Sequence, residues 1–320
     1  MPGGRDIFFE AIAAGTLLDS PPGYQEFNSF IAKIINFEKH PKIWAIGFRL
    51  LGYLFNWDRQ KASDYFDKVI NEIPNIFDSD IAIVYISRIL RFIPYKKTVQ
   101  DWIEKLGKKD NDFRKQAQGE LLFLYNLIHS NDAWGRGQLE FILENKGNNC
   151  VAQRGIAFGA SNNLKFIENQ ELCTKCIIAL SKTSDPITQK AVSSIFPYGQ
   201  KISLNKNMKN IINAILPNDG ILIHSAENLV KGISNQINLE PKLIGEICHR
   251  IIEVGRDEIR NYGSRYSMVA EPLVKICLTL HRMQPPYRSI GLDLFEELID
   301  SEIPQARTEL NILDRKPLLN

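Results

Sequence analysis

SKTSDPITQKAVSSIF, residues 181–196, places an acid directly before a proline and a small residue five positions after that proline. The Asp185 carboxylate can accept hydrogen bonds from the free amides of a first helical turn. Pro186 fits the first helical position because it has no N–H to leave unpaired. The stretch therefore predicts a helix that begins at residue 186. Ala191 falls within this helix, where a small side chain lets a neighbouring helix approach closely.

Two other stretches, HPKIWAI at 40–46 and EPLVKICL at 271–278, have the same order of a polar residue, a proline and an apolar stripe. Each predicts a helix start at its proline. Small residues also recur at similar positions of the proposed helices. They are Ala45, Ala117, Gly155, Ala191, Gly232 and Cys277, at intervals of 72, 38, 36, 41 and 45 residues, with an ambiguous copy around Ser87. A period of roughly 40 residues indicates helical hairpins that stack to bury their apolar faces.

Helical periodicity fills most of the chain. Apolar residues fall three or four apart in YQEFNSFIAKIINF at 24–37, in ASDYFDKVINEI at 62–73 and in VQDWIEKL at 99–106. Such spacing puts them on one helix face, whereas convincing strand alternation is nearly absent. We expect roughly fifteen helices joined by short connections, which predicts an all-α fold.

The run Asp185, Pro186, Lys190, Ala191 and Val192 resembles the second-helix signature of HEAT repeats, in which an acid and a proline precede a basic and a small residue. NDFRKQA at 111–117 is similar. The resemblance covers about 110–280, and periodicity alone extends it further. Two copies depart from the pattern, because no proline precedes Gly155 and Trp44 stands where a basic residue is expected before Ala45.

This resemblance implies a right-handed α-solenoid of about seven or eight helical hairpins, resembling HEAT and armadillo repeats. We expect one continuous repeat domain over 1–320, best defined over about 110–280, with 1–40 and 290–320 as caps. Such repeats serve many functions, so the resemblance implies the fold without naming an activity.

Composition excludes several classes of protein. The chain has 320 residues, 39 basic and 37 acidic, and a net charge of +2, so no overall field draws it to nucleic acid or anionic lipid. No run approaches the roughly 18 apolar residues of a spanning helix. Arg5, Asp6 and Glu10 interrupt the apolar start, unlike a signal peptide. We expect a cytoplasmic protein without a membrane partner.

Candidate chemical motifs favour packing over catalysis. In LCTKC at 172–176 the two cysteines are three apart and in line with Ile177 and Leu180, and no second pair completes a zinc site. His249 directly follows Cys248, but adjacent helix residues point about 100° apart. AWGRGQ at 133–138 lacks the third glycine of a dinucleotide loop. We therefore expect no catalytic residue, no metal, no cofactor and no enzymatic activity.

Two basic clusters are candidate contacts for an anionic partner. Four residues lie in SRILRFIPYKK and three in RDEIRNYGSRY: Arg88, Arg91, Lys96, Lys97, Arg256, Arg260 and Arg265. Basic side chains can contact phosphates, and the tyrosines of the second stretch can stack on bases. The alternative is a solvated helix face, which is the commoner role of helical charge.

Two functions remain open. The first is a non-catalytic protein-interaction, scaffold or sensing module. GLDLFEELIDSEIPQARTELNILDRKP at 291–317 resembles the last helices of large bacterial ATP-binding proteins of antiviral defence, which implies an arm of such a complex. The alternative is a nucleic-acid-binding solenoid, including a type resembling alkylpurine DNA glycosylases, with Trp134 and Asp132 as the nearest candidate pair.

Charge on the inner helices separates these hypotheses. They are expected at roughly 112–129, 149–162, 185–196 and 271–282. Basic residues gathered there favour nucleic acid, because phosphates dominate its affinity. Mixed or absent charge favours a protein partner.

Overall fold

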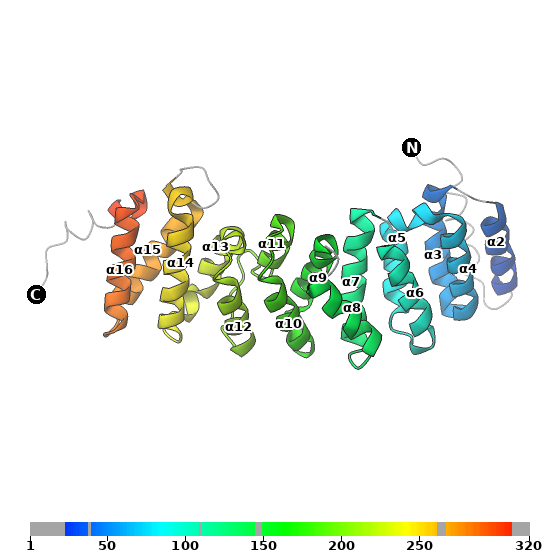
Figure 1. Cartoon of the computed structure of the whole chain (residues 1–320), viewed down its shortest axis with the longest axis horizontal. Coiled ribbons are helices and arrows are strands. Elements are labelled where there is room, and N and C mark those ends of the chain that lie inside the picture. The colour runs from blue at the N-terminus through cyan, green and yellow to red at the C-terminus, as the bar shows by residue number, and fades with distance from the viewer. Residues whose placement is uncertain (1–22, 38–39, 109, 145–148, 261–266, 309–320) are drawn as a thin grey trace, which may run out of the picture. The chain divides into compact units, whose positions relative to one another are not determined.

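The computed structural model describes residues 23–308 apart from 38–39, 109, 145–148 and 261–266 (Figure 1). All regular structure in these ranges is helical and none is strand, which confirms the all-α prediction. The chain divides into two compact units, Met1–Arg136 and Gly137–Asn320, and each is described by itself.

Within the described ranges, no helix combines the length and the apolar character needed to cross a membrane.

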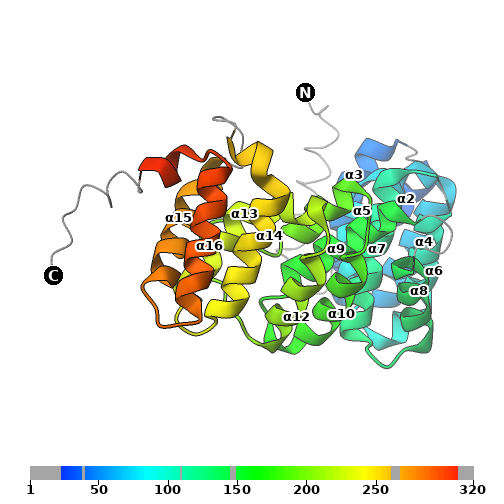
Figure 2. The same cartoon turned by 60° about the vertical axis from the view of Figure 1, so that its left-hand side comes forward.

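Unit 1 holds two layers of helices, which Figure 2 shows side by side. Its helices are α2 (Gly23–Phe37), α3 (Pro41–Trp57), α4 (Arg59–Glu72), α5 (Asp80–Ile89), α6 (Lys96–Gly107), α7 (Asp112–Ile128) and the start of α8 (Ala133–Leu143), with short 3₁₀ turns at Pro74–Asp78 and Ile93–Tyr95. In one layer α3 packs on α5 and α5 packs on α7. In the other, polar bonds join neighbours: Tyr65 Oη donates to Asn28 at 3.0 Å, and Trp102 Nε1 donates to Asp67 at 3.0 Å.

Unit 2 repeats this alternation. Its helices are the rest of α8, α9 (Cys150–Asn163), α10 (Gln170–Leu180), α11 (Pro186–Ser193), α12 (Lys206–Ile215), α13 (Asp219–Ile233), α14 (Pro241–Arg260), α15 (Ser267–His281) and α16 (Tyr287–Asp300), with 3₁₀ turns at Ile167–Asn169 and Ser234–Gln236. In one layer α9, α11, α13 and α15 pack on one another in turn. In the other, α10 packs on α12 and α14 packs on α16.

The predicted helix starts are confirmed at two of three prolines. The helix α11 begins at Pro186, and its N-cap Asp185 accepts a hydrogen bond from the Thr188 amide at 2.8 Å. The helix α3 begins at Pro41. Each start therefore follows from the missing proline N–H, which a first helical turn does not need.

The start predicted at Pro272 is wrong, because α15 begins at Ser267 and runs through this proline. Pro272 lacks the N–H that would bond to the carbonyl four residues earlier, so the longer helix gives up one bond. Val269 and Ala270 lie in that extra turn and are fully buried. Burial of these apolar side chains outweighs the lost bond.

The recurring small residues lie in the core where they are described. Ala117 and Ala191 are buried in α7 and α11, Gly155 and Gly232 in α9 and α13, and Cys277 in α15. Ser87 is half-buried. The side chain of Ala45 is outside the described residues.

Candidate functional site

The four basic residues of the first predicted cluster divide into two that form ion pairs and two that do not. Lys96 forms an ion pair with Asp132, and Lys97 pairs with Asp101 at 3.1 Å. Arg88, in the last turn of α5, and Arg91, just after that helix, are exposed and pair with no carboxylate of the described chain. Only these two arginines of the cluster are therefore available to a partner.

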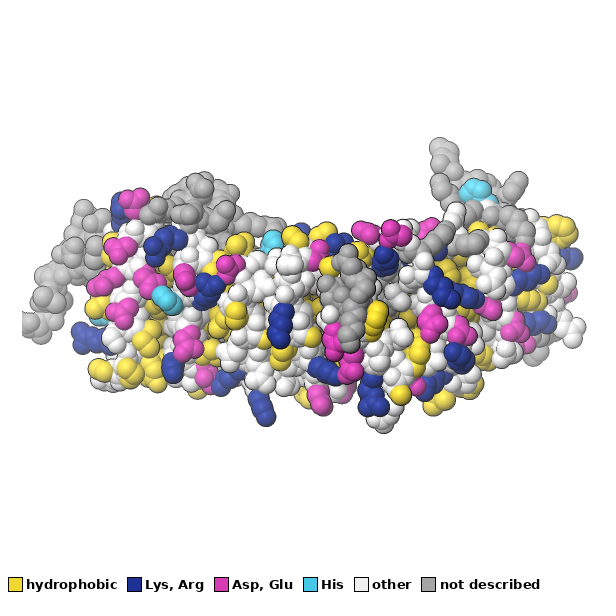
Figure 3. Space-filling view, viewed as in Figure 1, with side chains coloured by type: hydrophobic (Ala, Val, Ile, Leu, Met, Phe, Trp, Pro, Cys, Tyr) yellow, Lys and Arg dark blue, Asp and Glu magenta, His cyan; other side chains and the backbone are white. Residues whose placement is uncertain are grey.

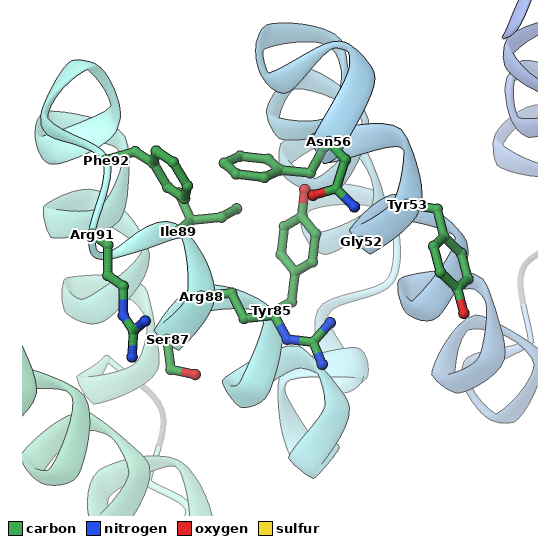
Figure 4. Close-up of a pocket in the computed structure, with 10 residues that line it drawn as sticks. Gly52, Tyr53, Asn56, Tyr85, Ser87, Arg88, Ile89, Arg91 and Phe92 are labelled. Carbon is green, nitrogen blue, oxygen red and sulfur yellow. The ribbon is translucent and has the colours of Figure 1, made fainter. Parts of the chain in front are cut away.

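Arg88 and Arg91 line a pocket of about 790 Å³ between α3 and α5 (Figure 4). Four lining residues come from α3 and six from α5 and the turn that follows it: Gly52, Tyr53, Phe55, Asn56, Tyr85, Ser87, Arg88, Ile89, Arg91 and Phe92. The pocket thus joins cationic, polar and aromatic groups from two helices of one unit.

The spacing of α5 explains why the arginines face outward. Tyr85, Ile86 and Ile89 bury one side of this short helix in the core. Val84, which is 48 % exposed, and Arg88, one turn later, then lie on the opposite side. Because one side of α5 must be buried in the core, Arg88 on the other side faces the pocket.

Arg88 approaches α3 at Gly52. A Cβ atom at this position would lie 3.4 Å from Nη1 of Arg88, an ordinary van der Waals contact, so the guanidinium reaches the surface of α3 at this glycine. Figure 4 shows Arg88 extending from α5 towards Gly52, while Arg91 and Ser87 lie away from α3. The two guanidinium groups consequently flank α5 on different sides.

Tyr85 brings an unsatisfied polar atom to the pocket. Its side chain is 3 % exposed, and its ring stacks on Phe66 with centroids 4.5 Å apart. The hydroxyl is buried without a hydrogen-bond partner, and Figure 4 places it beside Asn56. Burial, and to a smaller extent Tyr95, raises the pKa of this hydroxyl, which therefore stays protonated and able to donate near neutral pH.

The apolar wall of the pocket is an aromatic pair. The rings of Phe55 and Phe92 meet edge to face with centroids 5.1 Å apart. Arg59 lies over Phe92, its guanidinium carbon 4.2 Å from the ring centroid. Such contacts hold the wall in one geometry before any ligand arrives.

The second predicted cluster lies in unit 2 and is only partly described. Arg256 is an exposed residue of α14. The side chain of Arg260 and the whole of Arg265 lie outside the described residues. Arg256 is therefore the one member of this cluster that the structure places.

Trp134 and Asp132 are held by partners inside unit 1. Trp134 Nε1 donates to Glu104 at 2.8 Å, and its ring packs edge to face on Tyr125. Asp132 accepts from the Gly135 amide at 2.9 Å and pairs with Lys96. Burial alone would raise the pKa of Asp132, but the bonds from Lys96, Gly135 and Tyr125 outweigh it and lower that pKa. Both side chains thus stabilise the N-terminal turn of α8.

The described residues hold no cluster of three or more histidine, cysteine or acidic side chains that suits a metal. Cys173 and Cys176 are buried in α10, and burial raises the pKa of Cys173 to about 12. A thiol with so high a pKa is a poor nucleophile at neutral pH. His249 pairs with Glu297 at 2.9 Å, whereas the neighbouring Cys248 is fully buried.

Sequence reasoning found Arg88 and Arg91 but missed Gly52, Phe55, Tyr85 and Phe92. A pocket wall and a closed core have the same apolar spacing in a helix, so the pattern alone does not separate them. The glycine inside the aromatic run LGYLF at 51–55 is the one available signal.

In comparisons with family models, curated proteins and solved structures, none matches this chain.

Proposed function

We propose that this chain is a non-catalytic recognition module, a HEAT-like helical repeat protein that binds a protein partner through the exposed side of α3 and α5. It acts as a scaffold or sensing arm of a larger assembly. The observation that carries the proposal is the α3–α5 pocket, which joins two unpaired arginines to an aromatic wall. Such a surface supports recognition and contains no nucleophile with a base.

Recurring lateral bonds support the repeat character. In unit 1, Tyr65 reaches Asn28 across 37 positions and Trp102 reaches Asp67 across 35. In unit 2, Lys175 reaches Glu140 across 35. Similar separations in sequence are expected where each helix meets its counterpart one repeat away.

Charge on the inner helices supports a protein partner over nucleic acid. Arg114 of α7 pairs with Asp78, Arg154 of α9 with Asp185, and Lys275 of α15 with Glu271, at 2.5, 3.0 and 2.5 Å. Lys190 of α11 is exposed and unpaired. Figure 3 likewise shows basic and acidic side chains interspersed on the face it draws. Neutralised cations release few counterions, so they contribute little to phosphate binding.

Exposed apolar side chains at the pocket and beside it extend this surface. Tyr53 on α3 is 42 % exposed and Val84 on α5 is 48 % exposed. Aromatic residues and arginines together are typical of the central part of protein interfaces. The α3–α5 surface therefore has the composition of a protein-binding site.

Affinity capture of the full chain in its native host, followed by nuclease treatment, tests this function. We expect one protein to co-purify in stoichiometric amount and to be lost from a Tyr53→Ser/Val84→Ser variant. A matched control, Phe37→Ser/Tyr198→Ser, alters two exposed aromatic residues elsewhere and should keep the partner. Nucleic acid as the only captured material, or equal loss in both variants, would contradict the proposal.

A further inference from the structure

We infer that the α3–α5 pocket binds an acidic segment of its partner protein, with carboxylates on Arg88 and Arg91 and a bulky apolar side chain on the wall formed by Phe55 and Phe92. This inference rests on the proposed function, because it specifies which kind of protein segment the recognition surface takes.

Unpaired charge is the first reason. Elsewhere in unit 1, cations on α6 and α7 have acidic partners, as Lys105 has in Asp67 at 3.1 Å and Arg114 has in Asp78. Arg88 and Arg91 have none within the described part of the chain, although their guanidinium groups bind carboxylates in matched geometry. An anionic occupant would give both arginines the partners they lack.

The buried hydroxyl of Tyr85 is the second, independent reason. A buried polar atom without a hydrogen bond is costly, and native structures leave few of them. This hydroxyl is buried beside Asn56 on a residue that lines the pocket, so an acceptor reaches it only once that wall opens. As a neutral phenol it can then donate a hydrogen bond to a carboxylate or to a peptide carbonyl. A bound segment would satisfy it.

The volume and the apolar wall of the pocket indicate a ligand larger than a single inorganic anion. A volume of about 790 Å³ is within the roughly 300–1,000 Å³ of sites that enclose drug-sized ligands. Half-buried Phe92, backed by the more deeply buried Phe55, provides an apolar surface next to the charges. A peptide with acidic residues around an aromatic one matches both features.

The placement of the two arginines favours a peptide over a phosphate. Arg88 extends towards α3, whereas Arg91 lies with Ser87 away from it (Figure 4). Guanidinium groups that bind one phosphate converge on it, but here each faces its own side of α5. An extended segment that crosses α5 can carry two separate carboxylates on the face it turns to the helix, because its alternate side chains share a face. One carboxylate can then meet each arginine.

Fluorescence anisotropy with labelled peptides tests the inference on the full chain. The probes are GEEFEEG, its amide counterpart GQQFQQG, the phosphopeptide GSFSG phosphorylated on both serines, and a ten-nucleotide thymidine strand. We expect GEEFEEG to bind with a Kd below about 1 mM and at least roughly tenfold tighter than GQQFQQG. Tighter binding of the phosphopeptide or of the DNA strand would overturn the carboxylate assignment, as would no binding of GEEFEEG.

Variants then locate the site. Arg88→Ala/Arg91→Ala should weaken GEEFEEG binding at least roughly tenfold. A control that removes the same charge from the other layer, Lys68→Ala/Lys97→Ala, should change it less than about twofold. Tyr85→Phe keeps the ring packing and should weaken binding a few-fold, with unfolding monitored to show that the chain stays folded. Equal weakening in the arginine and lysine variants would overturn the inference.

The two proposals fail separately. If the captured partner protein still binds Arg88→Ala/Arg91→Ala at full strength, the acidic-segment inference is wrong while protein recognition stands. If no protein is captured but GEEFEEG binds as expected, the pocket recognises a carboxylate and the interaction function is wrong.

Discussion

Asp185 has two structural roles. Its carboxylate caps the N-terminus of α11, and it accepts two hydrogen bonds, of 3.0 and 3.1 Å, from Arg154 of α9. The Arg154 bonds are the largest cause of its lowered pKa, burial opposes them, and Thr188 adds to them, so the pKa falls from 3.8 to about 2. A single residue thus sets both a helix start and the contact between neighbouring helices.

The pH dependence of stability follows from this shift. Because the folded pKa is lowered, the ionised carboxylate stabilises the fold above about pH 4, and that contribution is lost as the pH falls towards 2. It amounts to about 2 kcal/mol. Urea unfolding between pH 2 and 6 should show this loss in the native chain and a flatter profile in Asp185→Asn and in Arg154→Met. A native slope in both variants would contradict the assignment.

Ala191 tests the proposed repeat register at the residue scale. It is 1 % exposed in α11, and its carbonyl accepts a bond from Ser161 of α9 at 3.2 Å. Ala191→Leu should overpack this contact and lower the free energy of unfolding by about 1 to 3 kcal/mol, measured by urea denaturation. Lys190→Leu adds the same side chain at the exposed neighbouring position and should change stability by less than about 0.5 kcal/mol. Similar losses in both would mean that the register is wrong.

At the scale of elements, Gly291 fixes how closely α16 approaches α15. A Cβ atom there would lie 2.4 Å from the His281 amide nitrogen and 2.6 Å from the Cys277 carbonyl oxygen. Both are backbone atoms, which relax less readily than the end of a side chain. Only a glycine therefore allows this packing.

Gly291→Ala should consequently lower the free energy of unfolding by roughly 3 kcal/mol in thermal or urea denaturation. The matched control is Gly137→Ala in α8, where a Cβ atom would meet nothing within 4 Å. That change should raise stability by up to about 1 kcal/mol, because alanine favours the helix. If Gly291→Ala left the free energy of unfolding unchanged, α15 and α16 would not be packed so closely.

The sequence predicted helices and helix starts correctly where local backbone chemistry alone decides them. Pro186 and Pro41 begin helices because proline tolerates that position. Pro272 does not, because burial of Val269 and Ala270 extends α15 upstream, and burial depends on neighbours that one stretch of sequence does not contain. Local chemistry therefore predicted the elements, and tertiary packing decided the exception.

The candidate site was less accessible to sequence reasoning. Asp101 follows Lys97 at the helical spacing of an ion pair and is visible in the sequence, but Asp132 reaches Lys96 from 36 positions away. Packing of separate helices also places the buried residues Phe55 and Tyr85 along a pocket wall. Charge patterning therefore found the two arginines, and only the folded chain showed what surrounds them.

For the whole molecule, the all-α architecture makes a spectroscopic prediction. Far-ultraviolet circular dichroism of the full chain should show a helical spectrum with less than about a tenth strand, against the roughly 20–25 % of ordinary globular proteins. A larger strand fraction would contradict the helical assignment of residues 23–308 apart from their gaps.

Recognition through α3 and α5 is the central claim, and hydrogen exchange measured by mass spectrometry tests it most directly. The full chain is compared alone and bound to the protein that co-purifies with it. We expect slower exchange in the backbone amides of α3 and α5, residues 41–57 and 80–89, and of the turn that carries Arg91 and Phe92. Protection confined to unit 2, or to α4 and α6 in unit 1, would contradict it.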